Sequence, residues 1–335
     1  MALSKPLILV SESTGFSKDA VALLRRIGRV VLGDLDRSEL LHALAPVDVL
    51  WVRLRHQIDE ELMECAPRLK VIITPTTGLN HIDMEEAARR GIRVLSLRGE
   101  TEFLKNVRAT AEHTMGLILA LIRHIPEAKS HVIGGGWSRD RFRGTELSGK
   151  TVGIVGYGRL GRIVSRLLLA FETRVLASDP HVWTTDVDPG VQVVPLNELL
   201  QQSDIVSLHV NLYAETTGFF GKEHFEQMKR GAWFVNTARG ELVDEGALLE
   251  ALQSGQLSGA ALDVLTEEHS TGMGNHPLVR YAREHDNLLL SPHIGGCTAE
   301  SMQKTELHMA RKLYDLFSTK QVVLSPLPAS EVHPA

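Results

Sequence analysis

The chain has 335 residues, enough for about two domains. Its composition, with 43% hydrophobic and 23% charged residues, is typical of a soluble globular protein. Its 36 basic and 41 acidic residues leave a net charge of −5, which argues against nucleic acid as the main partner because phosphate binding requires a basic surface. Only two cysteines, Cys65 and Cys297, are present. No disulfide framework is expected, and a cytoplasmic location is predicted.

No secretory signal is expected at the N-terminus, because its apolar run after Pro6 is too short. The longest apolar helical stretch, 115–122, is far shorter than the roughly 20 residues that a membrane span needs. No membrane contact is therefore predicted.

Short apolar runs bounded by turn residues alternate with amphipathic segments along the first hundred residues. Helices are predicted over 59–65 and 84–90, the second followed by Gly91 as a stop signal. This alternation indicates parallel βαβ units with helices on both faces of a sheet. The predicted strands are 6–10, 29–32, 47–52, 69–74 and 92–97.

The region after residue 98 has a different pattern. One long helix is predicted over 106–125, and a loop over 134–137. The part of this helix over 110–123 is apolar nearly all round and is therefore expected to be buried. The alternation then restarts, so a domain boundary is placed near residue 105. The strands predicted in this second part are 151–155, 174–178, 204–210, 232–236, 259–264 and 287–291.

A glycine-rich loop lies between the first of these strands and an amphipathic helix. Gly156, Gly158 and Gly161 form the pattern G-x-G-x-x-G in the strand–helix context that binding of a dinucleotide requires. The first glycine permits a tight turn, the second lets a pyrophosphate approach the backbone, and the third lets the helix pack closely. The free N–H groups of the helix N-terminus would then bind the phosphates.

Asp179 follows the next strand, 18 residues after Gly161. A carboxylate there accepts hydrogen bonds from the adenosine ribose and repels a 2′-phosphate, which favours NAD over NADP. The alternative is that Asp179 is only a helix cap.

Three further strands of the second domain end in side chains that can act together. Arg239, Glu268 and His293 offer a guanidinium, a carboxylate and an imidazole, and the carboxyl ends of parallel strands are where such sheets bind ligands. Arginine can hold a carboxylate and polarise a carbonyl, and histidine can donate a proton near neutral pH. This set suits hydride transfer to a 2-oxo acid.

Several ordered motifs resemble the D-isomer-specific 2-hydroxyacid dehydrogenases, especially those similar to 3-phosphoglycerate dehydrogenase. The resemblance covers nearly the whole chain, and its motifs are TTGLNHID (76–83), TAEHTMGLILALIR (110–123), GGWSRDRFRGTELSGKTVGIVGYGRLG (135–161), NTARGELVDEGAL (236–248), ALDVLTEE (261–268) and SPHIGGCT (291–298).

The resemblance implies a catalytic trio of Arg239, Glu268 and His293, with Glu267 as a competing choice for the carboxylate. It implies NAD as the cofactor and a small 2-hydroxy or 2-oxo acid as the substrate, phosphorylated substrates included. The cofactor contacts it implies, beside the three glycines, are Thr77, Arg159, Leu160, Asp179, Val210, Thr237, Ala238, Asp263 and Gly296.

Asp263 would face the nicotinamide carboxamide, and the alternative is that it only caps the following turn. The substrate carboxylate would bind the backbone N–H groups of Thr77, Gly78 and Leu79. Arg53, assisted by Arg55, would reach the far end of the substrate; the alternative for Arg53 is a solvated charge at the sheet edge.

The resemblance also implies an α/β architecture of two doubly wound parallel-sheet domains. A Rossmann NAD-binding domain, 106–297, would be inserted into a flavodoxin-like substrate domain made of 1–105 and 298–335. The last helix fits this, with Thr298 as its cap and an apolar stripe. The stripe consists of Met302, Met309, Leu313 and Leu316. A homodimer is expected from the family.

Other interpretations stay open beside the dehydrogenase. A non-catalytic NAD-sensing scaffold of the same fold is the main alternative, and formate dehydrogenase is disfavoured by glycine at position 274. The spacing of His269, His276 and His285 matches no zinc pattern, so no metal is predicted. Cys297 is expected to be a small buried thiol and not a nucleophile. The segment 97–106 departs from the family and is expected to decide the substrate.

Overall fold

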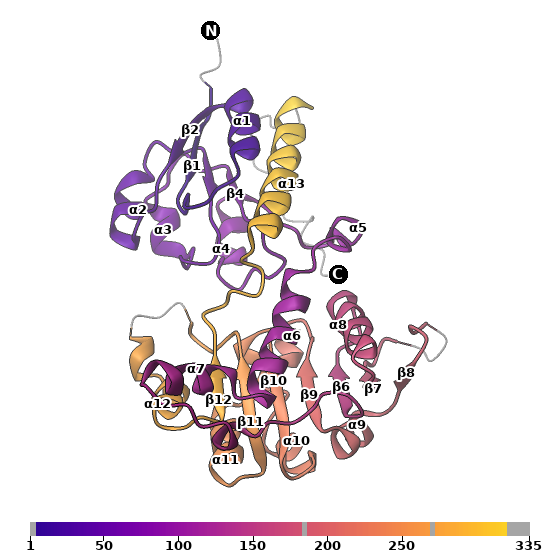
Figure 1. The fold of residues 1–335 in the computed structure, drawn as a ribbon. Helices are drawn as coiled ribbons and strands as arrows, with labels where there is room; N and C mark the ends of the chain where they lie inside the picture. The colour runs from indigo at the N-terminus through magenta and orange to yellow at the C-terminus, as the bar shows by residue number, and fades with distance from the viewer. Residues whose placement is uncertain (1–4, 183–185, 269–271, 320–335) are drawn as a thin grey trace. The chain divides into compact units, whose positions relative to one another are not determined.

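The computed structural model describes residues 5–182, 186–268 and 272–319 (Figure 1). The chain divides into two compact units. Unit 1 consists of the residues up to Val107 together with those from Thr298 on, and unit 2 is Arg108–Cys297. The first division lies two residues after the expected 105/106 boundary, and the second lies at the expected position.

Unit 1 is built on a five-stranded, fully parallel sheet in the order β2-β1-β3-β4-β5. All five predicted strands form, most of them shorter than the apolar runs that indicated them. Their bounds are β1 Leu7–Val10, β2 Arg29–Leu32, β3 Val49–Trp51, β4 Val71–Ile73 and β5 Arg93–Leu95.

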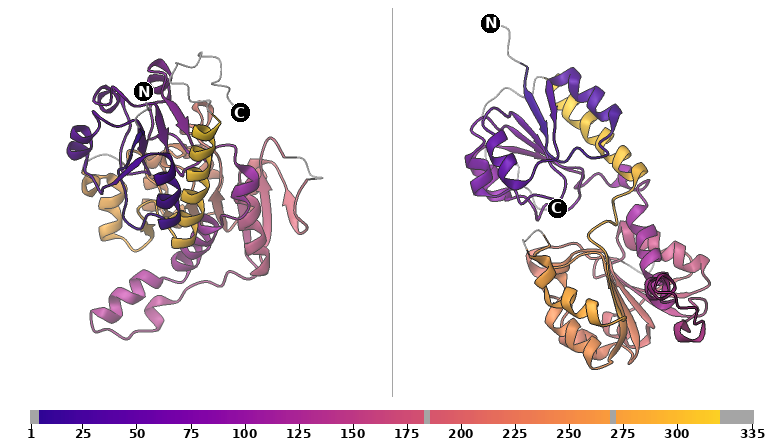
Figure 2. Two further views of the ribbon diagram at one scale, coloured as in Figure 1. Left: turned by 90° about the horizontal axis from the view of Figure 1, so that it is seen from above. Right: turned by 60° about the vertical axis from the view of Figure 1, so that its left-hand side comes forward.

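Helices cover both faces of this sheet, as the βαβ pattern predicts. The helices α1 and α13 lie side by side on one face, and α2, α3 and α4 cover the other (Figures 1 and 2). The bounds are α1 Lys18–Ile27, α2 Arg37–Ala43, α3 Glu60–Glu64, α4 Met84–Arg89, α5 Thr101–Leu104 and α13 Ala299–Ser318.

The last helix follows its prediction with one exception. Thr298 caps α13 by accepting a hydrogen bond from the N–H of Ser301, and Met309 and Leu313 are fully buried. Met302 is only half-buried and lies outside the core. The inward face of that turn is taken instead by the buried polar residues Ser301 and Thr305.

Unit 2 is built on a seven-stranded, fully parallel sheet in the order β12-β11-β10-β9-β6-β7-β8. The strand order reverses between β6 and β9, which is the switch point where such sheets bind ligands. The bounds are β6 Thr151–Val155, β7 Arg174–Ser178, β8 Val191–Val193, β9 Ile205–Leu208, β10 Ala232–Asn236, β11 Leu257–Leu262 and β12 Leu288–Leu290.

Both faces of the second sheet are covered. The helices α6 and α8 pack on one face, while α9 to α12 pack on the other. The helix bounds are α6 Ala109–Ile122, α7 Ile125–Ile133, α8 Arg159–Ala170, α9 Leu196–Gln202, α10 Lys222–Gln227, α11 Glu245–Gln253 and α12 Pro277–Glu284.

The single long helix predicted over 106–125 is wrong. The observed helix α6 begins later, at Ala109, and ends before His124, which has a left-handed backbone with φ 54°. A separate helix, α7, follows with Pro126 in its first turn, and it has no buried residue. Proline lacks an N–H and cannot continue the hydrogen bonding of the preceding helix, which accounts for the break. Within the described ranges, no helix is long and apolar enough to cross a membrane.

Candidate active site

The glycine loop connects β6 to α8 at the switch point of unit 2. Gly156 has φ +90°, and a Cβ atom there would lie 2.6 Å from the carbonyl oxygen of His209, so only glycine fits. A Cβ on Gly161 would lie 2.2 Å from the carbonyl oxygen of Gly156, which explains how closely the helix approaches the strand. The position of a Cβ on Gly158, by contrast, is open, with nothing within 4 Å.

The N-terminus of α8 is arranged to receive an anion. Gly158 is the N-cap residue and makes no side-chain cap, so no side chain of the cap residue occupies the first N–H groups of the helix. These groups and the helix dipole favour a phosphate at that position. Burial lowers the pKa of Arg159, the first residue of the helix.

Asp179 lies directly beside this loop. Its Oδ2 atom accepts a hydrogen bond of 2.8 Å from the N–H of Tyr157, and its Oδ1 atom accepts one of 2.9 Å from the N–H of His181. Among the described residues between β7 and β8, no helix begins, so the structure shows no helix there for Asp179 to cap. The carboxylate is therefore held at the end of β7, next to the glycine loop.

The turn after β10 is shaped by its asparagine and its glycine. The side chain of Asn236 donates to the carbonyl oxygen of Arg239 over 2.8 Å and accepts from the N–H of Ala238 over 2.9 Å. A Cβ on Gly240 would lie 2.1 Å from the carbonyl carbon of Leu265, so only glycine lets this turn approach the segment that leads to Glu268.

Arg239 projects from this turn with most of its hydrogen-bonding capacity unused. Among the described residues, its guanidinium makes one hydrogen bond, from Nη1 to the carbonyl oxygen of Ala238 over 2.6 Å. Burial lowers the pKa of Arg239, while the carboxylates of Glu268 and Glu241 act in the opposite direction. Arginine stays charged at neutral pH even so, and it can bind a carboxylate through two parallel N–H groups.

His293 and Glu268 form a close pair. The Nδ1 atom of His293 lies 2.5 Å from Oε1 of Glu268, and their side chains are 20% and 16% exposed. Glu267, the competing carboxylate, is exposed and has φ +55°, and this left-handed turn places the following residue, Glu268, against the imidazole. His293 also has a left-handed backbone, with φ +52°. Such strain persists only where the surrounding structure enforces it.

A buried carboxylate enforces the turn of His293. Asp263 is 1% exposed, and it accepts backbone hydrogen bonds from Ile294 to Oδ1 (2.9 Å) and from Gly295 to Oδ2 (2.7 Å). Its own carbonyl oxygen accepts from the N–H of His293 over 2.8 Å. Asp263 thus caps the turn at 293–295 and not the turn that follows Asp263 in the chain, and its expected contact with the nicotinamide carboxamide stays a prediction.

Comparison with known proteins identifies the family of the chain. Residues 115–295 match the family described as "D-isomer specific 2-hydroxyacid dehydrogenase, NAD binding domain". The chain belongs to this family. The matched range contains the glycine loop, Asp179, Arg239, Glu268 and His293.

Two relatives illustrate the range of D-2-hydroxyacid dehydrogenases that the chain is similar to. Glyoxylate reductase of Thermofilum pendens is 41% identical over 283 residues, which are 83% of this chain and 80% of that protein. D-3-phosphoglycerate dehydrogenase of Homo sapiens is 37% identical over 291 residues, or 86% of this chain, which spans only 52% of that protein's length.

A solved structure supports the fold. D-lactate dehydrogenase from Aquifex aeolicus, complexed with NAD and lactic acid, has 28% identity and a TM-score of 0.79, over 96% of this chain and all of that chain. The relatives therefore fix the family and not the substrate.

The residues of this 2-hydroxyacid dehydrogenase fit NAD at the glycine loop. Gly158 leaves open space above the backbone, the N-terminus of α8 has no side-chain cap, and Asp179 lies beside both. Gly156 would collide with the backbone at His209 and Val210 if it carried a Cβ, which places Val210 beside the loop as well.

The other expected cofactor residues of unit 2 lie near the carboxyl ends of the strands or at the start of α8. Thr237 is buried, and its hydroxyl lies 2.8 Å from that of Thr114 on α6, so its side chain serves the packing of this helix. Leu160 packs against the core on the α8 face, and Gly296 is exposed with open space at its Cβ position. Ala238 is nearly buried.

The expected substrate loop of unit 1 follows β4. Thr77 is exposed, and Gly78 and Leu79 are half-buried. The side chain of Thr76 donates to the carbonyl oxygen of Gly78 over 2.8 Å and so shapes the loop. None of the backbone N–H groups of residues 77–79 donates a hydrogen bond within the described part of the chain, as a carboxylate-binding loop requires.

Arg53 is not a solvated edge charge, so that alternative is wrong. Its guanidinium pairs with Glu306 of α13, a buried carboxylate that also accepts from the N–H of Ser17 over 2.7 Å, and it donates to the carbonyl oxygen of Thr14 over 2.9 Å. Arg53 thus ties the end of β3 to α13 within unit 1. Arg55 instead lies 3.5 Å from Asp34 at the surface.

The segment 97–106 forms a short helix held against α13. Glu100 binds Lys312 over 2.5 Å and His308 over 3.2 Å, and Lys312 is the main cause that lowers the pKa of Glu100. Phe103 stacks on the ring of His308 at 3.9 Å between centroids.

Two further expectations concern side chains outside the site. Cys297 is exposed, so its expected burial is wrong. Among the described residues, no group of three or more metal-binding side chains occurs, and His269 lies outside the described residues.

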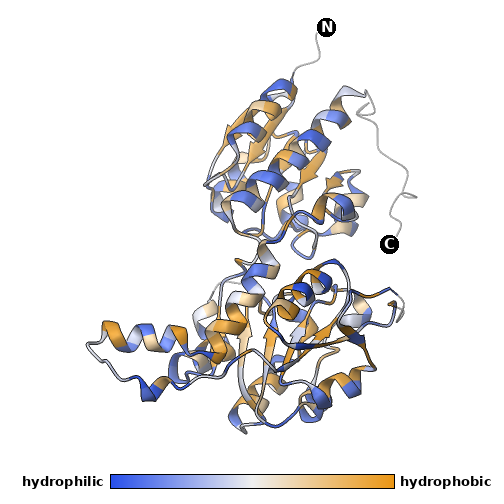
Figure 3. Cartoon of the chain, turned by 45° about the vertical axis from the view of Figure 1, so that its right-hand side comes forward, coloured by the Kyte–Doolittle hydropathy of each residue, from blue (hydrophilic) through white to orange (hydrophobic). Residues whose placement is uncertain are grey.

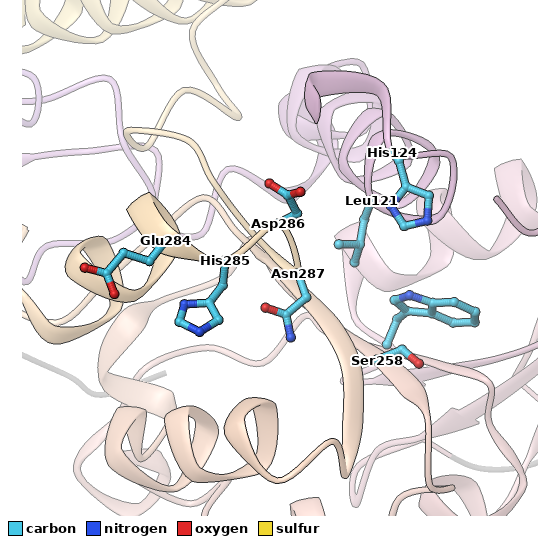
Figure 4. Close-up of a pocket in the computed structure, with 8 residues that line it drawn as sticks. Leu121, His124, Ser258, Glu284, His285, Asp286 and Asn287 are labelled. Atoms are coloured by element: carbon cyan, nitrogen blue, oxygen red, sulfur yellow. The ribbon is translucent and has the colours of Figure 1, made fainter. Parts of the chain in front are cut away.

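A surface hollow lies at the amino-terminal ends of strands in the second sheet, opposite to the ends that carry the site residues (Figure 4). It lies where β10, β11 and β12 begin, and the site residues lie where these strands end. Its lining residues are Leu121, His124, Trp233, Ser258, Glu284, His285, Asp286 and Asn287. Because none of these belongs to the glycine loop or the trio, the hollow is separate from the candidate active site.

Proposed function

We propose that this chain interconverts a small D-2-hydroxy acid and its 2-oxo acid with NAD as the redox partner. The observation that carries the proposal is the 2.5 Å contact between His293 and Glu268, on the same sheet edge as Arg239. The reaction needs a proton donor and a group that binds the substrate carboxylate. A histidine oriented by a carboxylate can be the first, and an arginine with unused N–H donors can be the second.

Bound NADH supplies the hydride that reduces the carbonyl carbon of the substrate. We propose that the chain holds it through the glycine loop, with Asp179 on the adenosine ribose and the first N–H groups of α8 on the pyrophosphate. The other proposed cofactor contacts are Thr77, Leu160, Val210, Thr237, Ala238, Asp263 and Gly296.

His293 is the proposed proton donor in the direction of reduction. Glu268 binds the Nδ1 atom, which fixes the orientation of the ring and leaves Nε2 for the oxygen of the substrate. The negative charge of Glu268 also stabilises the protonated imidazole, which is the form that must donate.

Arg239 is the proposed partner of the substrate carboxylate and of its carbonyl oxygen. A guanidinium can bind two oxygens at once, whereas an ammonium is a point charge. R239K should therefore lower kcat/KM by about a hundredfold, the effect of about 3 kcal/mol for a lost charged hydrogen bond. Steady-state kinetics on the best 2-oxo acid would measure it, and an R239K variant with unchanged kcat/KM contradicts the assignment.

The groups proposed to bind the rest of the substrate belong to unit 1. The free N–H groups of residues 77–79 support a carboxylate contact there. Arg53 is the proposed contact for the far end, but its charge is already shared with Glu306. Because of this pairing, we favour a substrate whose far end is uncharged over one whose far end carries a phosphate.

The experiment that tests the function is NADH oxidation with a panel of 2-oxo acids. Glyoxylate, pyruvate, hydroxypyruvate and 3-phosphohydroxypyruvate cover small, polar and phosphorylated side chains, and NADPH is the cofactor control. Turnover that falls 10²- to 10⁴-fold in H293A, as loss of a general acid predicts, supports the proposal. NADH binding without turnover on any acid would favour the NAD-sensing scaffold instead.

We also propose that the enzyme is a cytoplasmic homodimer. The helix α7 has no buried residue, Ile133 is 75% exposed and Trp137 is 89% exposed. Figures 2 and 3 show that the segment with α7 projects from the rest of unit 2 and carries hydrophobic stretches. An exposed apolar patch of this kind is typical of a subunit interface. Sedimentation equilibrium of the wild type and of W137S with I133S tests it, and a monomeric wild type contradicts it.

A further inference from the structure

A histidine of α6 contacts the buried carboxylate that holds the turn of His293. The Nε2 atom of His113 lies 3.1 Å from Oδ1 of Asp263 and 2.9 Å from the hydroxyl of Ser291. That hydroxyl itself donates to Oδ1 of Asp263 over 2.6 Å. Because a carboxylate only accepts hydrogen bonds, the hydrogen of His113 must be on Nε2.

Asp263 therefore receives donors from three separate elements. His113 belongs to α6, Ser291 follows β12, and the N–H groups of Ile294 and Gly295 belong to the turn itself. At 1% exposure, Asp263 has no solvent that could replace a missing donor. A buried charge with fewer donors loses the hydrogen bonds that fix its position.

The turn and α6 are packed together without intervening side chains. A Cβ on Gly295 would lie 2.9 Å from Oδ2 of Asp263, 3.2 Å from Thr110 and 3.6 Å from the ring of His113. A shift of the Asp263 carboxylate would therefore be transmitted to the turn, and with it to the left-handed backbone of His293.

We infer that His113 is a positioning residue for His293. Through Asp263 and Ser291 it holds the turn 293–295 in the conformation that aims the imidazole of His293 at Glu268. Its effect on turnover rests on the proposed function, whereas its effect on the His293–Glu268 contact does not.

A purely structural role for His113 makes a different prediction. The ring is 21% exposed at the edge of α6, where leucine would pack and keep the helix. If His113 only fills space, H113L leaves the imidazole of His293 where it is. If it positions the turn, H113L moves that imidazole while the fold stays intact.

The test compares H113L with H113Q, which keeps a side-chain N–H donor. E112Q is the matched control, because Glu112 is the exposed neighbour on the same helical turn. The first readout is the NMR resonance of the ε1 C–H group of His293, assigned by its loss in H293A. E268Q defines the resonance position when the ionic contact is broken. The second readout is kcat and KM on the best 2-oxo acid.

The positioning role predicts that the His293 resonance in H113L moves toward its position in E268Q, and that it stays near the wild-type position in H113Q and E112Q. It predicts a fall in kcat of ten- to a hundredfold in H113L, since misplaced reacting groups cost that much. The effects of H113L and E268Q on kcat should be less than multiplicative, because both act on one contact.

An unmoved His293 resonance in H113L overturns the inference, and so do fully multiplicative effects of H113L and E268Q. If H113L does not fold, H113Q still tests the donor in place of the imidazole, and S291A removes the second hydroxyl contact that His113 and Asp263 share, with the same readouts. Failure of the proposed function is distinct, since it appears as no turnover with any acid while the resonance still responds to H113L.

Discussion

The Nδ1 atom of His293 lies 2.5 Å from Oε1 of Glu268, although the two residues follow different strands of unit 2. His293 itself has a left-handed backbone, and Glu268 follows a residue that has one. Glu267 and Glu268 are adjacent, but only the second contacts the imidazole. We expect E268Q to lower kcat by on the order of a hundredfold, because a neutral amide stabilises the protonated imidazole less. E267Q is the matched control and should keep wild-type kcat. Equal losses in the two variants would contradict this assignment.

The carboxylate of Asp179 should decide between NAD and NADP. D179N keeps the size of the side chain and removes the charge that repels a 2′-phosphate. We expect the ratio of kcat/KM for NADH to that for NADPH to fall about tenfold or more, the effect of one charged hydrogen bond. D186N, at an exposed position on the following loop, should leave the ratio unchanged. If the ratio is unchanged in D179N, Asp179 does not contact the adenosine ribose of the cofactor.

The pair of Arg53 and Glu306 should matter more for stability than for binding. Burial raises the pKa of Glu306, and the Arg53 guanidinium and the Ser17 N–H oppose this. R53M leaves the carboxylate buried without its cation, which should lower the free energy of unfolding by about 3 kcal/mol. Urea unfolding measures this loss.

The double variant R53M with E306Q separates stability from substrate binding. Removal of both charges should recover much of the lost stability, because no unpaired buried charge remains. KM for the 2-oxo acid in this variant then reports the substrate role of Arg53 alone. A KM equal to that of E306Q would remove Arg53 from the substrate site.

The buried imidazole of His209 should make the fold sensitive to acid. Burial lowers the pKa of His209 to about 3, its Nε2 atom lies 3.0 Å from the hydroxyl of Ser207, and its Nδ1 atom has no partner within the described ranges. The folded chain thus keeps it neutral, whereas the unfolded chain binds a proton below about pH 6.5.

Stability from this residue is therefore constant above about pH 6.5 and is lost as the pH falls toward 3. The slope is about 1.4 kcal/mol per pH unit, or about 2 kcal/mol by pH 5. H209Q cannot titrate, so its free energy of unfolding should fall less than that of the wild type between pH 7.5 and 5. Parallel losses in the two proteins would show that His209 is not the group responsible.

Much of the fold and site was predictable because the signals are local. The strands of both sheets are short apolar runs, and the glycine loop and the trio lie in ordered motifs at strand ends. The break at His124 was missed because the apolar pattern continues across it, although Pro126 was an available signal. The edge strand β8, Val191–Val193, was missed as well.

The remaining features depend on contacts that no local pattern contains. Arg53 meets Glu306 across 253 positions of sequence, and His113 meets Asp263 across 150. Their partners follow from the packing of helices on sheets. This is also why sequence alone left open whether Asp263 caps a turn and whether Arg53 is solvated.

The two-part composition of unit 1 has a consequence for biosynthesis. Met309, Ala310 and Leu313 of α13 complete the core that α1 and the first sheet begin, yet 190 residues of unit 2 are translated in between. Unit 2 is one continuous stretch and can fold as soon as it leaves the ribosome. The first hundred residues must wait for the last helix, so they are the part of the nascent chain that most needs protection from aggregation.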